Sequence, residues 1–178
     1  VPERKVTVED VKYVLSSYYQ GTDYNPYGHH GEESKRGMYR PIGINRNNFV
    51  AITQLRPYVP AEMMGVEWIA VGSNAFNEAV PFYANVNATP AYLANTGKDA
   101  DTNNFYWANR LAGVLADAHY AACISHVERY QLKLASEGHR LLKAFDEAYQ
   151  AKPAEDATAY LTECNQKIAD TAQALTTD

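Results

Sequence analysis

Three apolar runs separated by turn residues lie between residues 38 and 86, and they constrain the fold of this chain more than any other feature. Consecutive apolar runs of this length, divided by glycine, proline and asparagine, are typical of buried antiparallel strands. The runs are RPIGINR, NFVAITQLR and GVEWIAVG. The second run carries apolar side chains on both faces near its middle, which predicts a strand that is covered on both sides.

The first two runs are separated by Asn47 and Asn48, and asparagine tolerates the left-handed backbone conformation that tight hairpin turns demand. A hairpin is therefore expected here, followed by a third strand in the run that contains Trp68. The sequence predicts a three-stranded antiparallel meander, with Trp68 buried on a central strand beneath helices. A short helical turn is expected directly afterwards at residues 73–78, before Pro81.

A helix is predicted from Thr7, because Thr7 and Asp10 form a capping box and apolar residues recur behind them at helical spacing. Gly21 is expected to end it. Residues 21–37, which are rich in glycine, then form a long surface loop. The loop contains paired histidines and nearby glutamates, but no HExxH or CxxC spacing accompanies them. We therefore expect a solvated loop and no metal site.

From Thr102 almost to the end of the chain, apolar residues recur at spacings of three and four, which predicts helices. The phase of this stripe slips once, so either two helices or one long bent helix is expected before Pro153. Pro153 starts a new element, a last helix that runs antiparallel to the preceding one. Cys164 lies on the apolar face of this last helix, so we assign it to packing and not to chemistry.

Taken together, these patterns predict an α+β fold, in which antiparallel strands are followed by a long helical C-terminal region. We divide the chain into residues 1–98, with the N-terminal helix, the loop and the meander, and residues 99–178, the helical region, within one continuous folded unit. Its 46% of hydrophobic and 21% of charged residues are ordinary for a globular domain. No glycine-rich phosphate loop, GxSxG elbow or Ser/His/Asp set stands out, so the residues alone define no reaction.

Charge and cysteine content narrow the range of partners. The net charge of −5 argues against a nucleic-acid partner, for which a basic face is expected. The longest uncharged run, residues 79–97, contains prolines and several asparagines, so it does not predict a membrane span. Two cysteines are too few for a disulfide framework, and we expect reduced thiols and a cytoplasmic location.

Three segments, RPIGINRNNF, LRPYVPAE and GVEWIAVGSNAFNEAVPFYANV, resemble in that order the downstream half of the dipeptidase A family of N-terminal-nucleophile cysteine peptidases. A weaker similarity extends from the opening VTVEDVKYVLSSYYQGTDYNPYG into the helical tail. The resemblance implies that the strands belong to an Ntn-hydrolase-like sheet, that the substrate is a dipeptide, and that no metal or organic cofactor is needed. It also implies a cysteine nucleophile at the mature N-terminus, with its own α-amino group as base.

On this resemblance the chain looks like the C-terminal portion of such an enzyme, because it begins with Val1 and the family nucleophile lies in an upstream half. Neither Cys123 nor Cys164 matches that nucleophile. We therefore assign no catalytic residue within the chain and expect it to be inactive alone. The alternative is a non-catalytic interaction domain, whose amphipathic helices associate with a partner or, in a homo-oligomer, with themselves.

Three polar residues are candidates for substrate binding: Asn45 and Arg46 at the end of the first predicted strand, and Asn74 just after the third. Arg46 is suited to holding a peptide carboxylate bidentately, because its guanidinium group is a planar fork. The alternative for Arg46 is a salt bridge to Glu62 or Glu67 that pins the hairpin. The alternative for Asn74 is that its amide satisfies its own turn.

Overall fold

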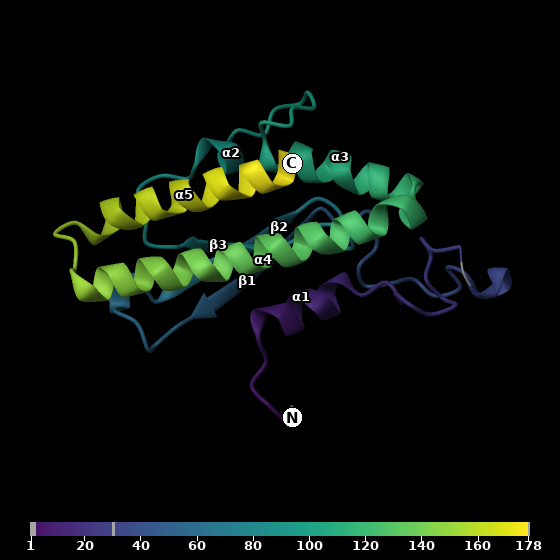
Figure 1. Ribbon diagram of the computed structural model, residues 1–178, viewed down its shortest axis with the longest axis horizontal. Coiled ribbons are helices and arrows are strands. Elements are labelled where there is room, and N and C mark those ends of the chain that lie inside the picture. Colours follow the sequence, from purple (N-terminus) through teal and green to yellow (C-terminus); the bar gives the residue numbers. More distant parts are fainter. Residues whose placement is uncertain (1–2, 30, 178) are drawn as a thin grey trace.

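The computed structural model describes residues 3–29 and 31–177, and over these residues the chain has the predicted α+β fold. A three-stranded antiparallel sheet packs against long helices that follow it in the sequence (Figure 1). The strands are β1 (Phe49–Leu55), β2 (Gly65–Val71) and β3 (Val80–Tyr83). The α-helices are α1 (Val8–Ser16), α2 (Ala91–Ala94), α3 (Phe105–Ala118), α4 (Tyr120–Ala151) and α5 (Ala157–Thr177), and short 3-10 turns occupy Glu33–Lys35 and Ala61–Met63. The division of the chain at residue 98 stays a prediction.

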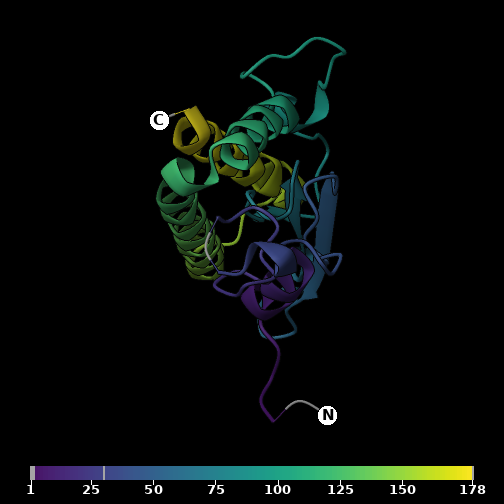
Figure 2. The same ribbon diagram turned by 90° about the vertical axis from the view of Figure 1, so that its right-hand side faces the viewer.

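The sheet has the strand order β1-β2-β3, and Trp68 on its middle strand lies between Ile52 and Pro81 of the neighbouring strands. Helix α4 runs along the sheet, and α5 lies antiparallel beside α4 (Figure 1). Figure 2 shows these long helices on one side of the sheet. The close approach of α4 depends on Gly138, because a Cβ atom there would come within 2.8 Å of Pro81 Cδ.

The core lies between the sheet and the two long helices α4 and α5. Three alternate residues of β2, Val66, Trp68 and Ala70, are at most 1% exposed. By contrast, Phe49 and Leu55 of β1 remain 57% and 69% exposed. The prediction that this strand is covered on both sides is therefore wrong, because the long helices pack on its opposite face only.

The first of the three predicted strands does not form, and residues 41–46 are bends and turns that connect α1 to β1. Gly43 approaches the end of α1 so closely that a Cβ atom would lie 2.1 Å from the Ser16 carbonyl oxygen. The Gly43 N–H group donates to the Ser17 carbonyl oxygen at 2.8 Å. This segment therefore pairs with the end of a helix, and the predicted hairpin before β1 is wrong.

The third strand of the sheet is β3, which lies within the uncharged run at residues 79–97. One helical turn leads to it, as predicted, with two N–H groups donating to the Ser73 carbonyl oxygen at 2.9 and 3.0 Å. The Asn165 side chain of α5 closes the outer edge of β3. It accepts from the Tyr83 N–H group at 2.8 Å and donates to the Tyr83 carbonyl oxygen at 3.0 Å. The Asn165 side chain thus satisfies the outward-facing backbone groups of Tyr83, as a neighbouring strand would do.

The helices are confirmed with shifted ends. Thr7 and Asp10 form the predicted capping box of α1, but α1 ends at Ser16, several residues before the predicted glycine. Of the two alternatives for the region before Pro153, the structure has two helices, α3 and α4, which are separated at His119. Within the described residues, no helix is both long enough and apolar enough to cross a membrane.

Replacing Trp68 with alanine should lower the free energy of unfolding by about 3–5 kcal/mol, because its ring is buried and its removal leaves a cavity beneath α4. Denaturant titration followed by far-UV circular dichroism measures the difference. Trp107→Ala is the matched control, since Trp107 is only partly buried at the start of α3 and should cost much less. An unchanged midpoint for Trp68→Ala would contradict the placement of this residue in the core.

Candidate functional site

Asn45 and Arg46 lie in a hollow of about 560 Å³ between the segment that follows α1 and the end of α3. The Asn45 Nδ2 group donates to Asp117 Oδ2 at 2.6 Å, and the Asn45 carbonyl oxygen accepts from Arg110 Nη1 at 3.4 Å. Both contacts tie the segment to α3. We call this site the loop hollow, and its polar lining comes from Tyr27, Arg40, Asn45, Arg46 and Asp117.

Two arginines lie at the loop hollow with their side chains exposed. In the described part of the chain, neither Arg46 nor Arg40 forms an ion pair, so no salt bridge from Arg46 to Glu62 or Glu67 pins a hairpin. Arg40 was not among the predicted site residues. The signal that could have found it is the run RPIGINR itself, which begins with Arg40 and ends with Arg46. Two guanidinium groups beside one hollow can together hold a carboxylate.

Asn74 does not join the other two predicted residues. It is buried in the turn after β2, where its Oδ1 atom accepts from Asn77 Nδ2 at 3.4 Å. Its carbonyl oxygen accepts from Lys12 Nζ at 3.2 Å. Asn74 is not part of the lining of the loop hollow, so a substrate contact at this residue stays a prediction, and its contacts here are with its own turn and with α1.

A buried lysine that the sequence did not single out holds this turn. Lys12 of α1 donates from Nζ to Ser16 Oγ at 2.7 Å and to the carbonyl oxygens of Asn74 and Asn77 at 3.2 and 3.0 Å. Burial lowers the pKa of Lys12, and the nearby carboxylate of Glu78 opposes this effect. Three acceptors match the three N–H groups of an ammonium group. Lys12 is therefore a connection between α1 and the turn after β2.

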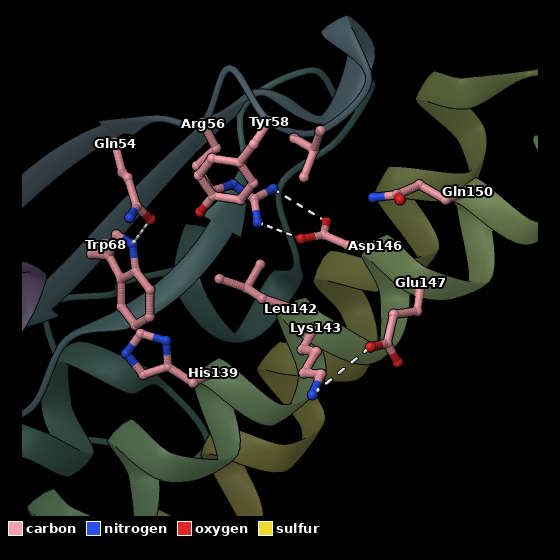
Figure 3. Close-up of a pocket in the computed structure, with 11 residues that line it drawn as sticks. Gln54, Arg56, Tyr58, Trp68, His139, Leu142, Lys143, Asp146, Glu147 and Gln150 are labelled. Carbon is pink, nitrogen blue, oxygen red and sulfur yellow. Dashed lines mark hydrogen bonds and ion pairs between the residues drawn. The ribbon is translucent and has the colours of Figure 1, made fainter.

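A second hollow, of about 440 Å³, lies between the sheet and α4 (Figure 3). At its inner end Arg56, directly after β1, forms a buried bidentate pair with Asp146 of α4. Arg56 Nη1 donates to Asp146 Oδ2 at 2.6 Å, and Nη2 donates to Oδ1 at 3.2 Å. Further bonds surround the pair: Arg56 Nη2 donates to the Met63 carbonyl oxygen at 2.7 Å, and the Tyr83 hydroxyl group donates to Asp146 Oδ1 at 2.9 Å.

The Arg56–Asp146 pair connects the sheet to α4. The positive charge of Arg56 and the negative charge of Asp146 cancel each other. Burial raises the pKa of the Tyr83 hydroxyl group, and the Asp146 carboxylate raises it further, so Tyr83 stays a hydrogen-bond donor to the pair. The two partners are 90 residues apart, and no local pattern in the sequence joins them. We therefore assign the pair to stability and not to substrate binding.

Cys164 does not have the surroundings of a nucleophile, and the thiol of Cys123 contacts a backbone carbonyl oxygen. Cys164 is buried, and burial raises the pKa of its thiol, which disfavours the reactive thiolate. Cys123 lies on α4, with its Sγ atom 3.9 Å from the Leu115 carbonyl oxygen. Among residues 3–29 and 31–177, no three His, Cys, Asp or Glu side chains come together as a metal site would need. Of the paired histidines in the loop, His30 lies outside the described residues.

Comparison with known proteins places the chain in a family. The model of Peptidase family C69 matches residues 1–133. A dipeptidase of Bifidobacterium longum is 53% identical over 146 residues, which are 82% of this chain and 27% of that protein. A "Probable dipeptidase A" of Streptococcus pyogenes is 45% identical over 172 residues, which are 97% of this chain and 36% of that protein. Dipeptidase A of Lactobacillus helveticus is 36% identical over 168 residues, which are 94% of this chain and 35% of that protein.

This chain therefore belongs to peptidase family C69, as the resemblance predicted. It spans about a third of the length of the curated relatives that it matches. The family match covers residues 1–133, so it includes every residue that lines the loop hollow, both in the segment after α1 and at the end of α3. The loop hollow is accordingly the candidate site of this part of the protein.

Replacing Asp146 with asparagine should lower the free energy of unfolding by about 3–5 kcal/mol, because it leaves the buried Arg56 without its counter-charge. Glu137→Gln is the matched control, because Glu137 pairs with Arg140 on the exposed surface of the same helix. This substitution should lower the free energy of unfolding far less. Denaturant titration of both variants measures the difference. If the two substitutions cost the same, the pair does not hold α4 on the sheet.

Proposed function

We propose that this chain is the downstream part of a cysteine dipeptidase and supplies part of its peptide-binding site. The observation that carries this proposal is the C69 family match, together with relatives named dipeptidase at 36–53% identity. The relatives' names favour a hydrolase that acts on dipeptides. In this proposal the nucleophilic cysteine lies in an upstream region, because the family resemblance implies a nucleophile at the mature N-terminus and neither Cys123 nor Cys164 matches it.

The proposed reaction is an acyl transfer. The thiolate of the N-terminal cysteine attacks the scissile carbonyl carbon, the amine of the second residue leaves, and water hydrolyses the acyl-enzyme. The free α-amino group of the cysteine serves as the proton carrier. Within this chain, Arg40 and Arg46 have the charge and the exposure to hold the substrate carboxylate in the loop hollow.

A non-catalytic interaction domain is the second candidate, and one observation favours it. Helix α3 exposes Leu111, Val114 and Leu115 by 39%, 54% and 60%. These residues follow helical spacing, so they form one apolar stripe on the surface. The apolar faces of α4 and α5 are less suited to this role, since they are largely buried against the sheet and against each other.

A chimera tests the dipeptidase proposal directly. The 146 residues of this chain that match the Bifidobacterium longum dipeptidase at 53% identity replace the corresponding region of that protein. If the chain supplies part of the peptide-binding site, the chimera should hydrolyse unblocked dipeptides, as measured by amine release. A chimera that folds, as circular dichroism shows, but has no turnover beside an active parent would argue against the proposal.

The 178-residue chain alone should show no dipeptide hydrolysis under reducing conditions, because neither of its two cysteines matches the N-terminal nucleophile that the family resemblance implies. The measurement is amine release from a panel of dipeptides. Cys123→Ala and Cys164→Ala variants are the controls. Turnover that is lost in either variant would overturn the assignment of the nucleophile to another region.

A further inference from the structure

We propose that Asp117 binds the α-ammonium group of an unblocked dipeptide, whose carboxylate is held by Arg40 and Arg46 across the loop hollow. The inference rests on the proposed function in that the ligand is a dipeptide. It goes further by assigning a residue to each end of that ligand. Asp117 was not among the residues that the sequence singled out.

The position of Asp117 on its helix favours a cationic ligand. Asp117 lies in the last turn of α3, where the helix dipole is negative and a carboxylate is electrostatically unfavourable. That turn contains no basic residue. Over the described ranges Asp117 also forms no ion pair with a lysine, arginine or histidine. An ammonium group that enters the loop hollow would supply the missing counter-charge.

Asn45 holds the Asp117 carboxylate in one orientation. Its Nδ2 group donates to Oδ2 at 2.6 Å, and in the described part of the chain this is the hydrogen bond that Asp117 receives, so Oδ1 stays free to accept another. Burial raises the pKa of the neighbouring Tyr27 to about 12, so its hydroxyl group stays neutral and donates to the Gly43 carbonyl oxygen at 3.3 Å. Tyr27 carries no positive charge, so it is no counter-charge for Asp117. We assign Asn45 to positioning Asp117.

The charges and the size of the loop hollow fit a dipeptide with two free ends. Arg40 and Arg46 provide two exposed guanidinium groups, and Asp117 provides one half-buried carboxylate. A dipeptide spans about 7 Å when extended. The volume of about 560 Å³ lies in the range of small-molecule sites. Recognition of both ends would exclude peptides that are blocked at either end, and a fixed spacing between the two charge sites would exclude longer peptides, whose ends lie farther apart.

The purified 178-residue chain tests the inference by ligand titration, followed by NMR chemical shifts or by calorimetry. The probes are alanyl-alanine, its N-acetyl derivative and its C-terminal amide. Each modification should weaken binding at least about tenfold, because a hydrogen-bonded charge is lost from one end of the ligand. Asp117→Asn should remove the preference over the N-acetyl derivative and keep the preference over the amide. Arg46→Ala should do the reverse.

Two further variants separate binding from positioning. Asn45→Ala removes the hydrogen bond that orients the Asp117 carboxylate. It should therefore weaken binding of alanyl-alanine and keep the preference over the N-acetyl derivative. Asp99→Asn is the matched control, since Asp99 is an exposed loop residue remote from the lining of the loop hollow, and it should change nothing. Thermal unfolding of each variant confirms that it folds.

Two results would overturn the inference. One is an Asp117→Asn variant that folds and still prefers alanyl-alanine over its N-acetyl derivative. The other is a folded wild-type chain that binds none of the three probes. Both results concern binding and leave the hydrolysis by the chimera to decide the proposed function, so the two failures can be told apart.

Discussion

The contact between α4 and the sheet at Gly138 sets the position of the other elements. A glycine at this point lets the helix backbone approach Pro81 and the ring of Trp68, and a Cβ atom would lie 3.6 Å from that ring. With α4 so close, the Arg56 side chain at the end of β1 reaches Asp146 of α4 as a buried bidentate pair. Because both charges of this pair are buried, removal of either partner would leave the other unpaired, so the pair holds α4 at this place on the sheet.

The two edges of the sheet differ in how they are completed. At β3, the amide of Asn165 bonds the N–H group and the carbonyl oxygen of Tyr83, so the helical layer itself closes that edge. At β1, Phe49 and Leu55 stay exposed on the outer face. An edge strand with exposed apolar side chains is a surface on which another strand can pair. The long helices thus complete one side of the sheet and leave the other available.

Contacts between residues that are close in the sequence could be predicted, and contacts between residues that are far apart could not. The capping box of α1 joins Thr7 to Asp10, and such local pairs were found from sequence. The first predicted strand failed because alternation over a few residues does not distinguish a strand from a turn, and here Gly43 packs against the end of α1. Asn45 was found as a polar residue at the end of an apolar run, but its partner Asp117 is 72 residues away, and no periodicity links the two. Partners that are this far apart in the sequence can be identified only once the fold is known.

The loop hollow lies in a segment with little regular structure, yet aromatic packing gives this segment a defined shape. Tyr27 of the loop packs against Tyr18 and Phe76, with ring centroids 5.3 and 5.2 Å apart. The hydroxyl groups of Tyr18 and Tyr120 lie 3.2 Å apart, and Asn25 Nδ2 donates to Tyr120 Oη at 3.2 Å. These rings join the loop to the end of α1, the turn after β2 and the start of α4. Three of the 14 tyrosines of the chain are thereby explained, because the rings of Tyr18, Tyr27 and Tyr120 fill this cluster while their hydroxyl groups form hydrogen bonds. Tyr27 also lines the loop hollow and donates to the Gly43 carbonyl oxygen, so the same cluster supports the backbone that carries Asn45, the partner of Asp117.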